Sequence, residues 1–163
     1  MNIKNYTSDV PTGTTINRIQ NLLIAAKVNG ITMEYGPNGN ILALLFHVDL
    51  DRRYSIRLTA NVDQVHEIFW KEYVGSDRLT QDGQAVAWGR KRRKKASFRE
   101  QAERTAWKLQ QDWVQVQLSL LLLQKVDFLQ VFMAYLWDGK QTFYQSIKDS
   151  GFLALPAPKE GSE

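Results

Sequence analysis

Apolar residues recur at steps of three and four over much of the C-terminal half of the chain, and this spacing is typical of an α-helix. The pattern runs from about Ser97 to Trp137, with neither Gly nor Pro before Gly139. Its repeating positions are Ala102, Ala106, Leu109, Trp113, Val116, Leu120 and Leu123. Ser97 and Glu100 have the S-x-x-E spacing of a capping box, so we expect the helix to begin there.

The length of this helix constrains the architecture. About 40 residues at roughly 1.5 Å each would extend about 60 Å, whereas a compact domain of this size is roughly 40 Å across. The helix therefore either breaks, most readily around residues 125–127, or projects and is covered by another subunit. The nearly continuous apolar run from Leu118 to Leu123 favours cover on several sides. We therefore also expect a homo-oligomer that forms through the long helix.

The N-terminal half predicts a helix, three strands and a second helix. Apolar spacing predicts the first helix over residues 12–26. Strands are predicted at 31–35, 41–48 and 54–58, with turns between them. Asn61 precedes the second helix, and Phe143, Tyr144 and Ile147 mark a short final one. The order predicts a single α+β domain over residues 1–155. Its elements are an N-terminal helix, a three-stranded antiparallel meander, a helix, a mobile basic loop (75–96), a long helix that is either continuous or kinked, and a short final helix. Residues 156–163 are expected to form a flexible tail.

The charge of the chain is concentrated in one place. The formal net charge is +4 over 163 residues. Six positive charges lie in one run, which leaves −2 for the rest of the chain. The run consists of Arg90, Lys91, Arg92, Arg93, Lys94 and Lys95. The protein is thus a nearly neutral domain with one cationic segment.

Two stretches of this sequence resemble a family of small tailed-phage and prophage proteins of unassigned activity. The first is Gln101-Ala102-Glu103-Arg104-Thr105-Ala106-Trp107-Lys108-Leu109 with Asp112-Trp113, an A-E-R-x-A-W-K/R-x-x-x-D-W helix; the second comprises 131–139, 142–144 and 151–156. The basic run and the leucine-rich centre of the helix depart from the family pattern. The resemblance implies an accessory phage gene expressed in the host bacterial cytoplasm, with counter-defence as a frequent role, and it transfers no functional residue.

The first candidate site is one face of the long helix. It consists of Arg104, Trp107, Lys108 and Gln111, at positions i, i+3, i+4 and i+7. Cationic groups pair with phosphates and an indole stacks on a base, so this face, doubled across a dimer, would bind an anionic nucleotide. Arg53 and Arg57 project from one side of the third strand and would join it. The alternative is a solvated helix face whose single aromatic residue packs under a neighbour.

The second candidate is the basic run, which Trp88 and Phe98 flank. Closely spaced cations release counterions from a nucleic-acid backbone, and aromatic rings stack on bases. The alternative is a disordered, solvating loop.

The third candidate is a divalent metal site at His47, Asp49 and Asp51, which alternate along a strand and its turn. Because turns favour Asp, the simpler interpretation is structural, and we expect no bound metal and no cofactor. The other histidine, His66, lies beside Glu67 on a predicted helix and has no nucleophile near it in sequence. A metal-dependent hydrolase is therefore a minor alternative to a protein without catalytic activity.

The leading hypothesis is a phage counter-defence factor that sequesters an anionic nucleotide signal of the cyclic-nucleotide or ADP-ribose type. One alternative is a nucleic-acid-binding accessory protein that acts through the basic loop. Another is an inhibitor of a host defence protein. We expect no signal peptide, because residues 1–10 lack an apolar core. We expect no membrane partner either, because the apolar run in the helix is too short to cross a bilayer.

Overall fold

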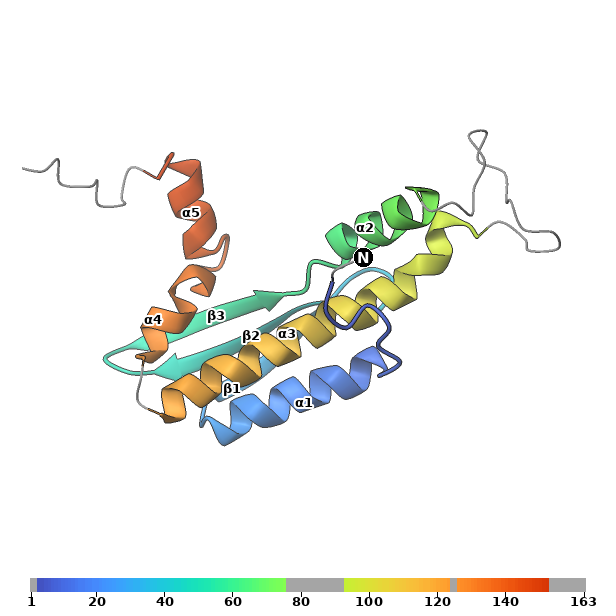
Figure 1. The fold of residues 1–163 in the computed structure, drawn as a ribbon. Helices are drawn as coiled ribbons and strands as arrows, with labels where there is room; N and C mark the ends of the chain where they lie inside the picture. The colour runs from blue at the N-terminus through green and yellow to red at the C-terminus, as the bar shows by residue number, and fades with distance from the viewer. Residues whose placement is uncertain (1–2, 76–92, 124–125, 153–163) are drawn as a thin grey trace, which may run out of the picture. The chain divides into compact units, whose positions relative to one another are not determined.

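The computed structural model describes residues 3–75, 93–123 and 126–152 (Figure 1). In chain order the elements are α1 (Thr12–Ala25), β1 (Asn29–Tyr35), β2 (Ile41–Asp49), β3 (Arg53–Thr59), α2 (Val62–Gly75), η1 (Lys95–Phe98), α3 (Arg99–Leu122), α4 (Phe128–Phe132), η2 (Met133–Tyr135) and α5 (Phe143–Asp149). This order confirms the predicted α+β class. Residues 76–92 of the predicted mobile loop and the predicted tail at 156–163 lie outside the described residues.

The chain divides into two compact units. The first contains Met1–Ala26 and Thr59–Ser119, and the second contains Lys27–Leu58 and Leu120–Glu163. Each unit is built from two separate stretches of the sequence. The predicted single domain over residues 1–155 stays a prediction.

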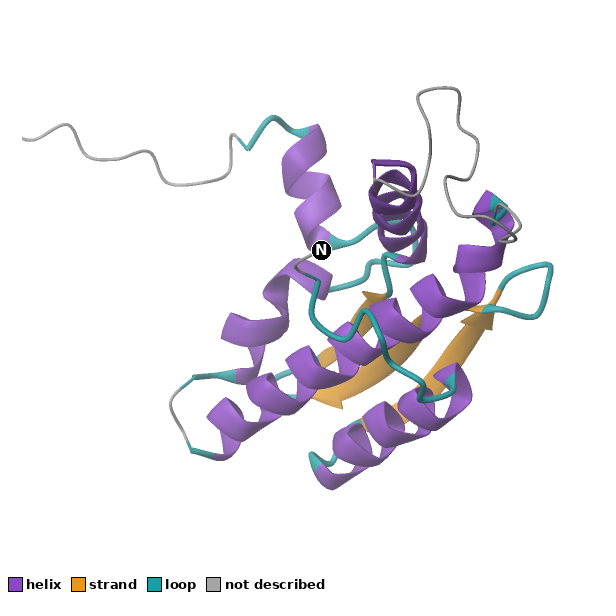
Figure 2. Ribbon diagram, turned by 45° about the vertical axis from the view of Figure 1, so that its right-hand side comes forward, coloured by secondary structure: helices purple, strands orange, loops and turns teal. Residues whose placement is uncertain are grey.

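In the first unit, α1 and α2 both pack against α3 (Figures 1 and 2). The contact between α2 and the start of α3 is a cluster of buried apolar side chains. Its members are Val65, Phe69, Phe98, Ala102 and Ala106. Their spacing of four residues, along α2 and along η1 and α3, brings them to one face, so burial of this face drives the pairing.

The residues before α1 are hydrogen-bonded to α3. Thr105 Oγ1 donates to the carbonyl of Asn5 at 3.1 Å. Gln101 Nε2 donates to the carbonyls of Tyr6 and Ser8 at 2.9 and 3.1 Å. Asn5 has a positive φ of 64°, a backbone conformation that Asn adopts more readily than most residues. The N-terminal segment is therefore part of the folded unit.

Of the two alternatives for the long helix, the structure shows the break. α3 has 24 residues and ends at Leu122, and α4 begins after Asp127. The backbone N–H of Asp127 donates to Gln130 Oε1 at 3.4 Å, one arm of a capping box. The length argument for a second subunit therefore no longer applies, and the homo-oligomer stays a prediction. In the described part of the chain, no helix combines the length and apolar content needed to cross a membrane.

The predicted capping box at Ser97 and Glu100 is wrong. Ser97 lies inside η1, and its hydroxyl donates to the carbonyl of Lys94 at 2.7 Å. The carboxylate of Glu100 instead accepts from Arg104 Nη1 at 2.8 Å. Because the chain enters α3 through a 3₁₀ turn, Ser97 is already helical and is not the residue ahead of the helix.

The second unit contains the sheet, in the order β1-β2-β3 with antiparallel neighbours (Figure 1). Ala43, Leu44 and Phe46 of β2 are buried, as expected for a central strand. The rings of Phe128 and Phe132 meet Phe46 edge-on, with centroids 6.4 and 5.7 Å away. These three rings fix α4 against the sheet.

Candidate functional site

The predicted face of the long helix is largely closed to ligands. Trp107 is 0% exposed and Gln111 is 7% exposed. Among the described residues, neither the indole N–H of Trp107 nor Oε1 of Gln111 has a hydrogen-bond partner. A fully buried ring has no free surface for a base, so the predicted stacking role of Trp107 does not fit the structure.

The cationic groups of this face are already paired. Arg104 Nη1 donates to the Glu100 carboxylate at 2.8 Å, and Lys108 Nζ lies 3.0 Å from the Asp112 carboxylate. Both are ion pairs within one helix, between residues four apart. An anionic ligand would therefore have to compete with a carboxylate at each position.

The Asp112 carboxylate is bonded to three side chains. Besides Lys108, it accepts from Lys4 Nζ at 2.7 Å and from Asn5 Nδ2 at 3.0 Å. Partial burial alone would raise its pKa, but the bonds from Lys4, Asn5 and Lys108 outweigh that effect and lower the pKa to about 2. Asp112 thus holds the N-terminal segment against α3, which is a structural role.

Arg53 and Arg57 belong to the second unit and are paired within it. Arg53 contacts the Asp49 carboxylate at 2.9 and 3.2 Å. Arg57 contacts the Glu34 carboxylate at 2.6 and 3.0 Å, and its guanidinium lies 4.8 Å from the ring centroid of Trp137. Being four residues apart on β3, the two arginines share one side of the strand, and each is charge-compensated there.

The predicted metal ligands do not converge. His47 Nδ1 lies 2.9 Å from Ser55 Oγ. Asp49 binds Arg53, which keeps the pKa of that carboxyl low, and the hydroxyl of Tyr54 does the same for Asp51. Within the described ranges, no three His, Cys, Asp or Glu side chains gather as a metal site would require. His47, Asp49 and Asp51 therefore do not form the predicted metal site.

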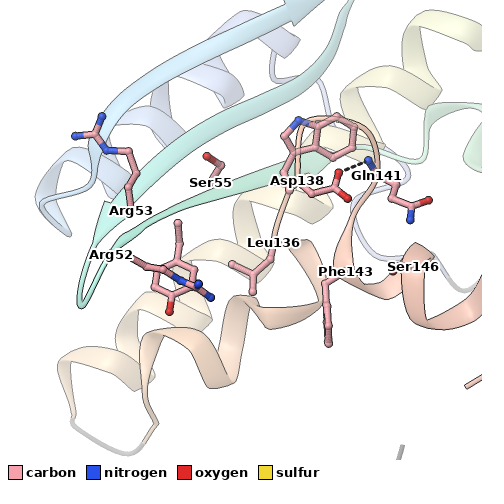
Figure 3. Close-up of a pocket in the computed structure, with 10 residues that line it drawn as sticks. Arg52, Arg53, Ser55, Leu136, Asp138, Gln141, Phe143 and Ser146 are labelled. Carbon is pink, nitrogen blue, oxygen red and sulfur yellow. Dashed lines mark hydrogen bonds between the residues drawn. The ribbon is translucent and has the colours of Figure 1, made fainter. Parts of the chain in front are cut away.

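A hollow of about 380 Å³ lies beside the start of β3 (Figure 3). It is lined by Arg52, Arg53, Tyr54, Ser55, Leu136, Trp137, Asp138, Gln141, Phe143 and Ser146. Arg52 and Arg53 point to opposite sides of the strand in Figure 3, so their charges do not meet at one ligand. The Asp138 carboxylate accepts from the backbone N–H of Lys140 and of Gln141, both at 2.7 Å, which keeps its pKa low. The hollow therefore mixes both signs of charge and favours no particular ligand class.

The described end of the basic run is fixed to α2. The backbone N–H of Arg93 donates to the hydroxyl of Tyr73 at 2.9 Å, and the guanidinium of Arg93 lies 4.2 Å from the ring centroid of Phe98. The carbonyl of Lys95 lies 2.8 Å from His66 Nε2. These contacts determine where the cationic segment joins the first unit.

Two cations at this junction are neutralised and two are not. Lys95 is paired with Glu67 and Arg99 with Asp63, and each pairing lowers the pKa of the carboxyl involved. Arg93 and Lys94 are exposed. No carboxylate partner for these two occurs among the described residues. Arg93 and Lys94 therefore carry positive charge that no described carboxylate compensates.

A cluster of three aromatic rings lies beside Arg93. Trp70, Tyr73 and Phe98 form a cluster with centroid distances of 5.7 Å (Trp70–Tyr73), 6.3 Å (Trp70–Phe98) and 5.2 Å (Tyr73–Phe98). Phe98 is only 8% exposed, so its predicted contact with bases does not fit the structure. Trp70 and Tyr73 are half-buried. The prediction missed them, although their i, i+3 spacing on the helix before the basic run was visible in the sequence.

Comparisons with protein-family models, with curated proteins and with solved structures found no match. The fold and the site define a small α+β protein with a cationic and aromatic junction where α2, η1 and α3 meet. Its function is inferred from the chemistry of this junction.

Proposed function

We propose that this protein is a phage accessory protein that binds nucleic acid through the basic run. The observation that carries the proposal is the junction just described. Arg93 and Lys94 are exposed and lack carboxylate partners in the described part of the chain. Arg93 also contacts the buried ring of Phe98 and the hydroxyl of half-buried Tyr73. Cations of this kind release counterions from a phosphate backbone. The likeness of the Gln101–Trp113 helix to phage proteins supports a phage origin and action in the host cytoplasm.

The distribution of charge favours a polymer over a single nucleotide. Residues 90–94 carry five positive charges in five consecutive positions of the sequence, a density of charge that suits a repeating phosphate chain. At the predicted nucleotide site on α3, by contrast, the ring is buried and both cations are paired. Nucleic-acid binding therefore agrees better with the geometry than nucleotide sequestration does.

Neutralising the basic run is expected to abolish most of this binding. The test variant replaces Arg90, Lys91, Arg92 and Lys94 with Gln and retains Arg93, whose guanidinium packs on Phe98. At about 100 mM salt its affinity for a fluorescein-labelled oligonucleotide should fall by at least about tenfold, because roughly four phosphate contacts are lost. Fluorescence anisotropy measures the affinity.

The matched control changes the same number of charges elsewhere. It replaces the exposed residues Arg18, Lys27, Lys140 and Lys148 with Gln, so that both variants have the same formal net charge. The control should retain nearly all of the affinity. An equal loss in both variants would show that overall charge, and not the basic run, attracts the nucleic acid, and would contradict the proposal.

A further inference from the structure

The aromatic cluster at the root of the basic run adds a second kind of contact to its charge. We infer that the nucleic acid bound here is single-stranded and that one of its bases stacks on Trp70. This inference rests on the proposed function. It concerns only described residues of the first unit: Trp70 and Tyr73 of α2, Arg93, and Phe98 of η1.

The three rings of the cluster differ in their exposure and in their contacts with Arg93. Phe98 is buried, and the guanidinium of Arg93 lies 4.2 Å from its ring centroid. The hydroxyl of Tyr73 accepts from the backbone N–H of Arg93, so this residue positions the cationic segment. Trp70 lies at the margin of the apolar cluster of α2 and α3 and is half-buried. Its indole is therefore partly exposed, and it belongs to the same cluster as Phe98 and Tyr73, the two rings that Arg93 contacts.

An indole beside cations selects for unpaired bases. In a duplex the bases are stacked on one another inside the helix, so a ring on a protein surface cannot reach their faces. In a single strand each base has an open face, and stacking on an aromatic side chain strengthens binding by roughly 5- to 150-fold per base. The cations follow the backbone while the ring holds a base, the arrangement typical of sequence-tolerant single-strand binding.

The experiment separates stacking from charge with three probes of equal length: oligo-dT, an abasic single strand with the same backbone, and a duplex. We expect the wild-type protein to bind oligo-dT about tenfold more tightly than the abasic strand. In Trp70→Leu this ratio should fall close to one, with the affinity for the abasic strand unchanged. Trp137→Leu, which changes a half-buried tryptophan of the second unit, is the matched control and should keep the wild-type ratio.

Trp70→Phe is the control for misfolding of Trp70→Leu, because it keeps an aromatic ring in the apolar cluster. Oligo-dT should quench the tryptophan emission of the wild-type protein more than that of Trp70→Phe, and the abasic strand should quench both equally. The inference is overturned if the wild-type protein binds oligo-dT and the abasic strand equally, or if the quenching is the same in both proteins. If none of the three probes binds in a salt-dependent way, the proposed function itself fails.

Discussion

Trp107→Ala is expected to lower the free energy of unfolding by roughly 3–5 kcal/mol. Trp107 is the largest of the fully buried side chains described, at 0% exposure. Its truncation removes a large apolar surface from the core and leaves a cavity that neighbouring side chains fill only in part. Urea unfolding followed by circular dichroism measures the change, which would be a large part of a typical domain's stability.

Trp107→Phe is the control for this variant, and it should cost less than half as much. The indole N–H has no hydrogen-bond partner among the described residues, so its removal breaks no described hydrogen bond. If Trp107→Ala had the same free energy of unfolding as the wild-type protein, the ring of Trp107 would have to lie at the surface. That result would contradict the structure and revive the predicted stacking role on α3.

Asp112→Ala is the second variant with a large expected effect, a loss of about 2 kcal/mol at neutral pH. The carboxylate accepts hydrogen bonds from Lys4, Asn5 and Lys108. Its removal leaves these donors without that acceptor and frees the N-terminal segment from one of its attachments to α3. Asp112→Asn keeps the shape but loses the charge, so it should be intermediate.

The pH dependence of stability provides a separate check on Asp112. Its pKa in the folded protein, about 2, lies below its ordinary value. A lowered pKa means that the stabilisation is present above about pH 4 and is lost as the pH falls from there toward 2. Since other carboxyls titrate in the same range, the quantity to measure is the difference in unfolding free energy between wild type and Asp112→Asn. This difference should shrink below pH 4; a constant difference would show that the charge of Asp112 contributes nothing.

Much of the fold was predictable because its patterns are local. Alternation along 54–58 and the apolar run at 41–48 identified strands that the structure confirms. The break after α3 was harder to predict from the sequence, because no Gly or Pro marks it. Its main signal is Asp127, followed three residues later by Gln130. The capping box at Ser97 failed because a 3₁₀ turn precedes the helix, and the S-x-x-E spacing does not distinguish the two cases.

The site was less predictable, because helical spacing shows which residues share a face but not what covers that face. Trp107 shares a face with Arg104 and Lys108, so the sequence suggested an exposed surface; in the structure the indole is buried and the cations are paired beside it. Trp70 was overlooked because it lies on the helix before the basic run, whose apolar residues suggested only a buried face. The fold alone places its ring next to Phe98 and Tyr73.

The salt dependence of binding tests the central claim most directly. The affinity of the wild-type protein for a single-stranded oligonucleotide of about 12 residues would be measured by anisotropy between about 50 and 300 mM KCl. Four to five phosphate contacts predict a slope of log K against log salt of about −3, since each contact contributes about −0.7. A slope near zero, or no binding at the lowest salt concentration, would contradict the account.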